Sequence, residues 1–265
     1  MFYRLTIIFT LILSASQLYA ADTSPYRLSI AMDSIFLGSG AALLISSFYF
    51  RQNINPLTDD EIASLSRNDI NRFDRSAAGN WSPTGDRLSN VTLATAMISP
   101  IAFLLNDTTR NDFMVIGVMY GESMLLAGGL NVATKNITQR KRPFVYNDNT
   151  PHNEKKKRDV MFSFYSGHTA QAFNSAVFFS TVFSDYFPQS QWRYIVWGTS
   201  LLAASTTGYL RYHAGKHYPT DIIAGAIVGS MTGWAVPALH RNKNENIAFK
   251  MAVGVESIIA IELYF

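Results

Sequence analysis

Three short clusters of side chains in the second half of the chain could act together on a phosphate ester. They combine cationic, hydroxyl, imidazole and carboxylate groups, and their members are Lys135 and Arg142, then Ser166, Gly167 and His168, then Arg211, His217 and Asp221. Lysine and arginine neutralise a dianionic phosphate, and guanidinium N–H groups match its oxygens two at a time. Two histidines can supply a nucleophile and a general acid near neutral pH. The sequence therefore predicts phosphoryl transfer.

The position of each cluster along the chain adds to this prediction. Ser166 and Gly167 precede an apolar run, so we expect them at the N-terminus of a helix, where free N–H groups favour an anion. Asp221 follows His217 by four residues. On a helical turn, that spacing would let the carboxylate accept a hydrogen bond from one ring nitrogen and leave the other free to attack.

Each feature alone has an ordinary structural interpretation. A lysine or arginine at the end of a membrane helix commonly anchors that helix, and a His–Asp pair on a helix is more often structural than catalytic. The clusters favour chemistry together, because all of them lie at the edges of apolar segments and nothing comparable occurs elsewhere.

Six apolar segments must position the clusters, and they cover residues 33–50, 90–105, 112–132, 168–184, 193–210 and 221–239. Each approaches the ~20 residues of a spanning helix, and several are rich in the small residues that let membrane helices pack closely. We predict an all-α, six-helix, membrane-embedded bundle, with a soluble helical bundle as the alternative. If each segment crosses once, the clusters converge at one face, and the active site lies at the helix ends there.

Composition agrees with a membrane protein. The chain is 48% hydrophobic and 15% charged, against roughly 25% charged for an average soluble domain. The absence of cysteine excludes disulfides and thiolate metal sites, and a net charge of +3 gives no support to nucleic-acid binding. We expect a signal peptide or N-terminal anchor over 1–20, the helical domain over 21–240, and a tail of unclear structure over 241–265.

Two polar stretches separate the apolar segments. Residues 51–89 are expected to form an ordered loop or a short interfacial helix, with no chemistry assigned to them. Residues 144–162 contain the basic run 155–158. Such a run is usually a solvated face, although beside a membrane it could attract anionic head groups.

The three clusters resemble the signature of the type 2 phosphatidic acid phosphatase and vanadium haloperoxidase superfamily. That signature reads K-x6-R-P, then P-S-G-H, then S-R-x5-H-x3-D, and the match runs from Lys135 to Asp221. The resemblance implies that His217 is a nucleophile forming a phosphohistidine, that Asp221 orients it, and that His168 protonates the leaving alkoxide. It also implies a set of groups that hold the phosphoryl oxygens, namely Lys135, Arg142, Ser166, Gly167 and Arg211. No metal or other cofactor is expected in the reaction.

The chain departs from the signature at two positions. Tyr165 stands where the family usually has proline, and Leu210 stands where it usually has serine. We expect Tyr165 to change loop stiffness rather than chemistry. The missing serine hydroxyl removes one hydrogen bond, worth roughly 0.5–1.5 kcal/mol, so reduced activity is the largest expected effect.

The resemblance implies a phosphatase that acts on a phosphomonoester or pyrophosphate of a membrane lipid. Three alternatives stay open: a soluble secreted acid phosphatase, a catalytically idle lipid-binding membrane protein, and a phosphotransferase. The apolar run 222–229 suits lipid or a buried bundle. We expect a bacterial-type inner membrane with the site on the periplasmic side, as in bacterial relatives. The excess of lysine and arginine on that face favours the opposite side.

Overall fold

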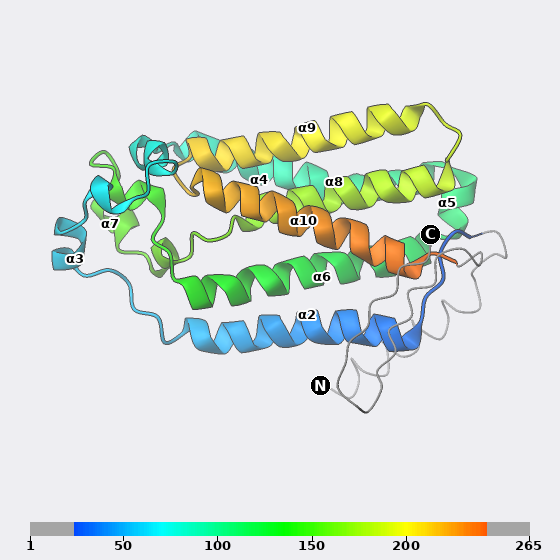
Figure 1. Cartoon of the computed structure of the whole chain (residues 1–265), viewed down its shortest axis with the longest axis horizontal. Helices are drawn as coiled ribbons and strands as arrows, with labels where there is room; N and C mark the ends of the chain where they lie inside the picture. Colours follow the sequence, from blue (N-terminus) through cyan, green and yellow to red (C-terminus); the bar gives the residue numbers. More distant parts are fainter. Residues whose placement is uncertain (1–23, 243–265) are drawn as a thin grey trace.

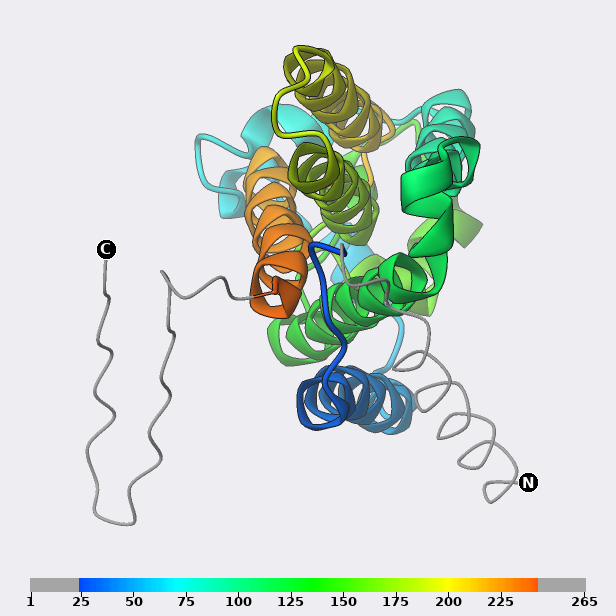
Figure 2. The ribbon, with the colours of Figure 1, turned by 90° about the vertical axis from the view of Figure 1, so that its right-hand side faces the viewer.

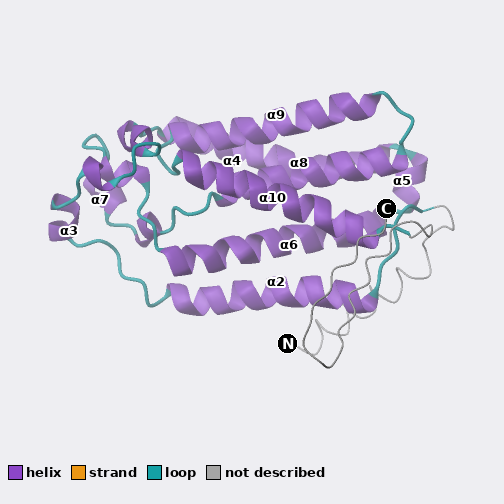
Figure 3. Cartoon of the chain, in the orientation of Figure 1, coloured by secondary structure: helices purple, strands orange, loops and turns teal. Residues whose placement is uncertain are grey.

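The computed structural model describes residues 24–242, which form a bundle of long helices with a polar cap at one end (Figure 1). The long helices are α2 (Ile30–Arg51), α4 (Pro83–Ile98), α6 (Phe113–Thr138), α8 (Gly167–Tyr186), α9 (Trp192–His213) and α10 (Pro219–His240). Among these residues Figure 3 shows no strand, and the sole β-type contact is an isolated bridge between Tyr26 and Arg241. The predicted all-α fold is confirmed. The expected signal segment 1–20 and most of the tail 241–265 lie outside the described residues.

Helix α8 forms the centre of the bundle. It packs against α4, α6, α9 and α10, and Figure 2 shows it surrounded by these helices when the bundle is viewed along its length. More than half of its residues are buried, including Asn174, whose amide donates to the Thr232 hydroxyl of α10 (2.8 Å). Helix α2 lies outside this group and packs against α6.

Glycines allow α8 and α10 to approach closely. A Cβ atom on Gly229 would lie 2.0 Å from the carbonyl oxygen of Ala170, and one on Gly225 would lie 2.6 Å from that of Ser166. Small residues at such crossings let the backbones of membrane helices touch. The contact brings the first turns of α8 and α10 together.

The outer surface of the bundle is apolar. Within the described part of the chain, four segments are long and apolar enough to cross a membrane, namely Ile30–Arg51, Pro83–Leu105, Phe113–Tyr146 and Pro219–His240. Large apolar side chains on these segments are exposed, among them Phe48, Leu105, Ile227 and Trp234. Such surfaces are stable in lipid rather than water. The chain is a membrane protein.

Two helices extend further than the hydropathy pattern predicted. α4 begins at Pro83, seven residues before the predicted start, with Ser82 as its N-cap accepting from the N–H of Gly85 (3.1 Å). The 3₁₀ helix η3 (Ser99–Leu105) continues it. α6 continues to Thr138, so Lys135 lies within the helix rather than after it. In both helices the additional turns are polar because they face the cap.

Short elements make up the polar cap. Those before α4 are α3 (Asp59–Ala63), η1 (Arg67–Asp69) and η2 (Arg75–Gly79), and those before α8 are η4 (Pro143–Tyr146), α7 (His152–Lys155) and η5 (Arg158–Met161). At the other end, α5 (Asp107–Asn111) joins η3 to α6. In the basic run, Lys156 pairs with Asp59 (2.7 Å) and Lys157 pairs with Glu154 (2.5 Å). This run therefore helps to join the elements of the cap.

Candidate active site

All three predicted clusters lie at the capped end of the bundle. The C-terminal ends of α6 and α9 meet the N-terminal ends of α8 and α10 there, at the left of Figure 1. The backbone N–H of Ser166 donates to the carbonyl of Asp221 (3.0 Å), which joins the second cluster to the third. Residues that are far apart in the sequence are thus placed around one point by helix ends.

His217 lies in the loop before α10 and is almost completely buried, at 1% exposure. Its Nε2 atom is 3.3 Å from Nη1 of Arg142. Because a guanidinium can only donate, Nε2 must carry a lone pair and the proton of a neutral ring belongs on Nδ1. Nε2 is therefore the nitrogen able to attack an electrophile.

The contact between His217 and Asp221 differs from the prediction. His217 precedes the helix instead of lying on a helical turn, and its Nδ1 is 3.6 Å from Oδ2 of Asp221, beyond hydrogen-bonding distance. No described residue accepts a hydrogen bond from Nδ1. The carboxylate faces the ring but is held by other groups.

Asp221 is fully buried and fixed by three donors. Its Oδ2 accepts from the Ser163 hydroxyl (2.5 Å) and from the backbone N–H of Tyr218 (3.0 Å). Its Oδ1 accepts from Nη1 of Arg140 (2.6 Å). Three hydrogen bonds hold this carboxylate in place beside the imidazole.

Arg140 also binds a second buried carboxylate. Its Nη2 donates to Asp74 (2.7 Å), which in turn accepts from the N–H and hydroxyl of Thr220 (3.0 and 2.6 Å). Burial acts to raise the pKa of Asp74, but hydrogen bonds from Thr220 and Arg140 outweigh it and leave that pKa lowered. The segment 51–89, to which the sequence assigned no chemistry, thus supplies an anchor for the first turn of α10.

Arg142 is 4% exposed and is held in one orientation. Its Nη2 pairs with Asp159 (2.9 Å), and its Nε and Nη1 donate to the carbonyls of Asp159 (3.0 Å) and Lys216 (3.1 Å). Burial acts to raise the pKa of Asp159, but the charges of Arg142 and Lys135 dominate and lower it. Arg142 therefore presents a fixed positive charge to His217.

Arg211, also 4% exposed, is held by α4. Its Nη1 donates to the carboxylate of Asp86 and to the hydroxyl of Ser89 (3.2 Å). Its Nε–H is buried and has no acceptor among the described residues, so it can donate to an oxygen of a bound anion. Leu210 takes the place of the family's serine, and here the hydroxyl contact to the arginine comes from Ser89 instead.

The second cluster forms the start of α8. Ser166 is the N-cap, and its hydroxyl accepts from the N–H of Thr169 (3.3 Å). The N–H groups of the first turn have no partner within the helix, so those of Gly167 and His168 are available to an anion. A Cβ on Gly167 would lie 2.6 Å from Oδ1 of Asn131, so a larger residue there would displace the Asn131 side chain.

His168 is half-buried and is oriented by α4. Its Nε2 lies 2.7 Å from Oδ1 of Asn90, which as a carbonyl oxygen accepts from an N–H there. Nδ1 of the ring then remains for exchange with a ligand. The ammonium of Lys135 adds positive charge near Arg142 and Arg211.

Electrostatics keep the buried histidine neutral. Burial is the main reason that the pKa of His217 lies well below 6.5, and the charges of Arg142, Arg211 and Lys135 lower it further. Burial beside Arg142 and Arg211 also lowers the pKa of Lys216. An unprotonated imidazole surrounded by cations can attack an anion that those cations bind.

The structure brings together all eight predicted residues and adds others that the sequence did not identify, namely Asp74, Asp86, Asn90, Arg140, Asp159 and Lys216. Arg140 and Lys216 lie inside the spacers of the predicted clusters. Asp86 and Asn90 are i, i+4 neighbours at the start of α4, a spacing that places both on one helix face. The i, i+4 spacing of Asp86 and Asn90 is visible in the sequence, but its meaning could be recognised only once the position of α4 was known.

Comparisons with known proteins identify a family and a relative that this chain resembles. The model of the PAP2 superfamily matches residues 116–245. A lipid A 4'-phosphatase of Bacteroides thetaiotaomicron is 38% identical over 78 residues, which are 29% of this chain and 31% of that protein. The match thus spans about a third of the relative's length.

One solved structure also shows a partial likeness to this chain. The crystal structure of a transmembrane PAP2 type phosphatidylglycerolphosphate phosphatase from Bacillus subtilis covers 76% of this chain and 95% of its own, with a TM-score of 0.46 and 18% identity. The family match includes α8, α9 and α10 completely, together with every predicted site residue. Residues 116–245 of the chain therefore resemble the PAP2 superfamily.

Proposed function

We propose that this chain hydrolyses a phosphomonoester of a membrane lipid, with His217 as the nucleophile. One observation carries the proposal: a buried imidazole presents Nε2 beside the fixed guanidinium of Arg142, at the polar end of a bundle whose outer surface is apolar. The cations bind the phosphate, and the apolar surface keeps the site near lipid head groups.

In the first step, the lone pair of His217 Nε2 attacks phosphorus and the bond from phosphorus to the lipid oxygen breaks. His168, protonated while the bound phosphate dianion offsets the nearby cations and still donating from Nε2 to Asn90, gives its Nδ1 proton to the leaving alkoxide. The Nδ1–H of His217 faces Asp221, whose negative charge stabilises the positive charge that develops on the ring. Lys135, Arg142 and Arg211 stabilise the equatorial phosphoryl oxygens.

In the second step, water attacks the phosphohistidine. The now neutral His168 accepts a proton from this water, the P–N bond breaks, and the electron pair returns to His217 Nε2. Inorganic phosphate leaves, and both histidines regain their starting protonation states. Transfer to another acceptor instead of water would make the enzyme a phosphotransferase.

The substrate class follows from where the site lies. Arg142 and Arg211 are buried at the ends of membrane helices, so a phosphate on a lipid reaches them along the apolar surface. The name of the Bacteroides relative makes lipid A the first substrate to test. We place the site on the periplasmic side of a bacterial-type inner membrane, as is common among bacterial relatives.

The test is phosphate release from purified full-length protein in detergent. Substrates are lipid A, phosphatidic acid, phosphatidylglycerol phosphate, an isoprenyl pyrophosphate and the soluble ester p-nitrophenyl phosphate. We expect release from at least one lipid, and we expect His217→Ala to lower it by about a thousandfold or more. His152→Ala is the matched control, because His152 is exposed beside Asp59 in the cap and makes no contact with the site.

Two outcomes would overturn the proposal. Equal release by His217→Ala and the parent chain would exclude the histidine nucleophile. Strong preference for the soluble ester would support the acid phosphatase alternative instead.

A further inference from the structure

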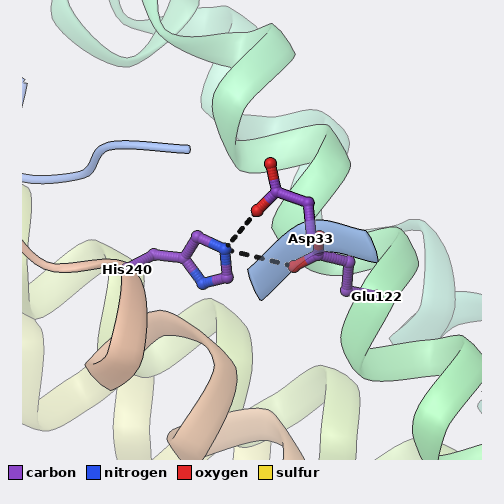
Figure 4. Close-up of side chains that lie close together, drawn as sticks. All are labelled: Asp33, Glu122 and His240. Atoms are coloured by element: carbon purple, nitrogen blue, oxygen red, sulfur yellow. Dashed lines mark hydrogen bonds and ion pairs between the residues drawn. The ribbon is translucent and has the colours of Figure 1, made fainter. Parts of the chain in front are cut away.

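Three buried titratable residues cluster at the end of the bundle opposite the active site. Asp33 comes from the first turn of α2, Glu122 from α6, and His240 from the last turn of α10 (Figure 4). Side-chain exposure is 0% for all three. Nineteen residues of α10 separate His240 from Asp221, about 28 Å at 1.5 Å per residue. The phosphate chemistry proposed above makes no use of this cluster.

The hydrogen bonds of His240 fix which nitrogen faces the carboxylates. Nδ1 lies 2.8 Å from the carbonyl oxygen of Val236, so Nδ1 carries a proton and donates it. Nε2 lies 2.9 Å from Oδ1 of Asp33 and 3.4 Å from Oε2 of Glu122. In a neutral ring, the Nε2 lone pair would thus oppose two carboxylate oxygens, so a proton or a metal cation must lie among them.

One proton does not satisfy this cluster. A proton on Nε2 can be donated to Asp33, but both oxygens of Glu122 and Oδ2 of Asp33 are still without a hydrogen-bond partner among the described residues. The three groups would then carry a net charge of −1 inside a membrane bundle. A divalent cation with a neutral imidazole and two carboxylates brings the net charge to zero, and buried charge is tolerated in that form.

We propose that Asp33, Glu122 and His240 bind a divalent transition-metal ion of the zinc class. One ligand atom from each residue lies within 4.8 Å of the others. Tetrahedral ligands at about 2.1 Å from zinc lie about 3.4 Å from each other, and the two spacings from Nε2 of His240 are 2.9 and 3.4 Å. A backbone carbonyl that fixes the far nitrogen of a histidine is the usual support for a metal ligand. Imidazole with carboxylates suits zinc better than magnesium or calcium.

The position of the cluster gives the ion a structural role. A cavity of ≈ 620 Å³, lined by residues 27–32 and 239–242, reaches His240. The three ligands belong to three different helices, so a bound ion joins the start of α2 to the end of α10 through α6. The site is independent of phosphate release, which depends on groups at the other end of the bundle.

Zinc content of the full-length protein tests the proposal, using an affinity tag without histidine. The protein is stripped with chelator in detergent, exposed to Zn²⁺, separated by gel filtration and measured by mass spectrometry. We expect about one Zn²⁺ per chain and a higher Tm after zinc is restored. Glu122→Gln should retain about tenfold less zinc and show no shift in Tm. His152→Gln, which alters an exposed His–Asp pair, should bind zinc like the parent chain.

A second measurement keeps the proposal testable if Glu122→Gln does not fold. Co²⁺ bound to the stripped parent chain should give the visible d–d bands of a four-coordinate N/O site, and Zn²⁺ should displace it. A parent chain that rebinds neither ion, or a folded Glu122→Gln that binds as much zinc as the parent, would overturn the proposal. Phosphate release measured on the same samples separates this outcome from failure of the proposed function.

Discussion

At the scale of single residues, each arginine of the site is fixed by a carboxylate. Arg140 binds Asp221, Arg142 binds Asp159 and Arg211 binds Asp86. The carboxylates hold the guanidinium groups in position before a substrate arrives, so little reorganisation is needed when a phosphate binds. Two of these carboxylates, Asp159 and Asp86, lie outside the motif positions of the family signature.

The depressed pKa of His217 predicts a pH profile. Only the neutral ring can attack, and since burial and nearby cations hold its pKa below 6.5, the acid limb of kcat/KM should lie below pH 6.5. Arg142→Gln removes the first of those cations, so the pKa should rise and the acid limb should move to higher pH by about one unit. The measurement is kcat/KM against pH for one substrate.

The same substrate is used for both proteins, so ionisation of the substrate itself affects both pH profiles equally. Arg110→Gln, at the opposite end of the bundle in α5, is the control and should leave the limb in place. An acid limb that is unchanged in Arg142→Gln would mean that this guanidinium does not set the charge state of His217.

Arg140 predicts a loss of stability. Its side chain is 26% exposed, but Asp74 and Asp221 are at 0%, so Arg140→Met leaves two buried carboxylates without their cation. We expect the free energy of unfolding to fall by about 3 kcal/mol, with loss of activity as Asp221 shifts. Thermal unfolding in detergent measures this effect. Arg67→Met, on the exposed surface of the cap, should cost less than about 1 kcal/mol. Equal stability of the two variants would contradict the assigned role of Arg140.

The sequence predicted the residues that we propose to face the phosphate, but not the residues that hold them. The sequence alone identified Lys135, Arg142 and Arg211, because cations beside histidines at helix edges indicate phosphate chemistry. It did not identify Asp74 and Asp86, because a buried carboxylate in a polar loop or in the first turn of a helix looks the same in the sequence as a solvent-exposed one. Their function depends on tertiary contacts more than 100 residues away along the chain.

At the scale of elements, the contact between α8 and α10 sets the geometry of the site. The first turn of α8 holds Ser166, and the first turn of α10 holds Asp221. Their backbones are hydrogen-bonded, and Gly225 and Gly229 allow this approach. Any side chain that separates these helices should also move the phosphate-binding groups.

Gly229→Ala tests this dependence. Its Cβ would overlap the carbonyl of Ala170, so we expect a loss of about 1–3 kcal/mol in stability together with lower activity. Gly198→Ala on α9 is the matched control, because nothing lies within 4 Å of its Cβ, and it should leave stability unchanged or slightly raised. Thermal unfolding and phosphate release are measured on both. Full activity in Gly229→Ala would show that close helix contact does not position the site.

Hydropathy located the helices better than it located their ends. All six predicted segments correspond to long helices. Among the described residues, four segments that contain α2, α4, α6 and α10 are also long and apolar enough to span a membrane. The first turns of α4 and the last turns of α6 are polar because they line the cap, so an apolar pattern cannot mark them. The same polar turns carry Asp86, Asn90 and Lys135.

At the scale of the whole molecule, the two ends of the bundle differ in chemistry. One end gathers the cations and histidines of the proposed phosphatase site, and the other holds the acidic cluster of α2, α6 and α10 (Figure 1). The apolar surface lies between them. Because the two ends differ, the orientation of the chain in the membrane decides into which compartment the phosphate is released.

The absence of cysteine makes that orientation measurable. Asp148→Cys places one exposed thiol in the cap, and Gln189→Cys places one between α8 and α9 at the other end. With a membrane-impermeant maleimide on intact bacterial spheroplasts, we expect Asp148→Cys to be labelled and Gln189→Cys to require permeabilisation. The reverse pattern would place the site on the cytoplasmic side.

The most direct measurement is chemical identification of the phosphorylated intermediate. The protein is mixed with a lipid that carries ³²P in its terminal phosphate, quenched within milliseconds in alkali, where phosphohistidine survives, and digested for mass spectrometry. The account predicts label on the peptide that contains His217, lost on acid treatment and absent from His217→Ala. Label on another residue, or undiminished turnover in His217→Ala, would contradict the account.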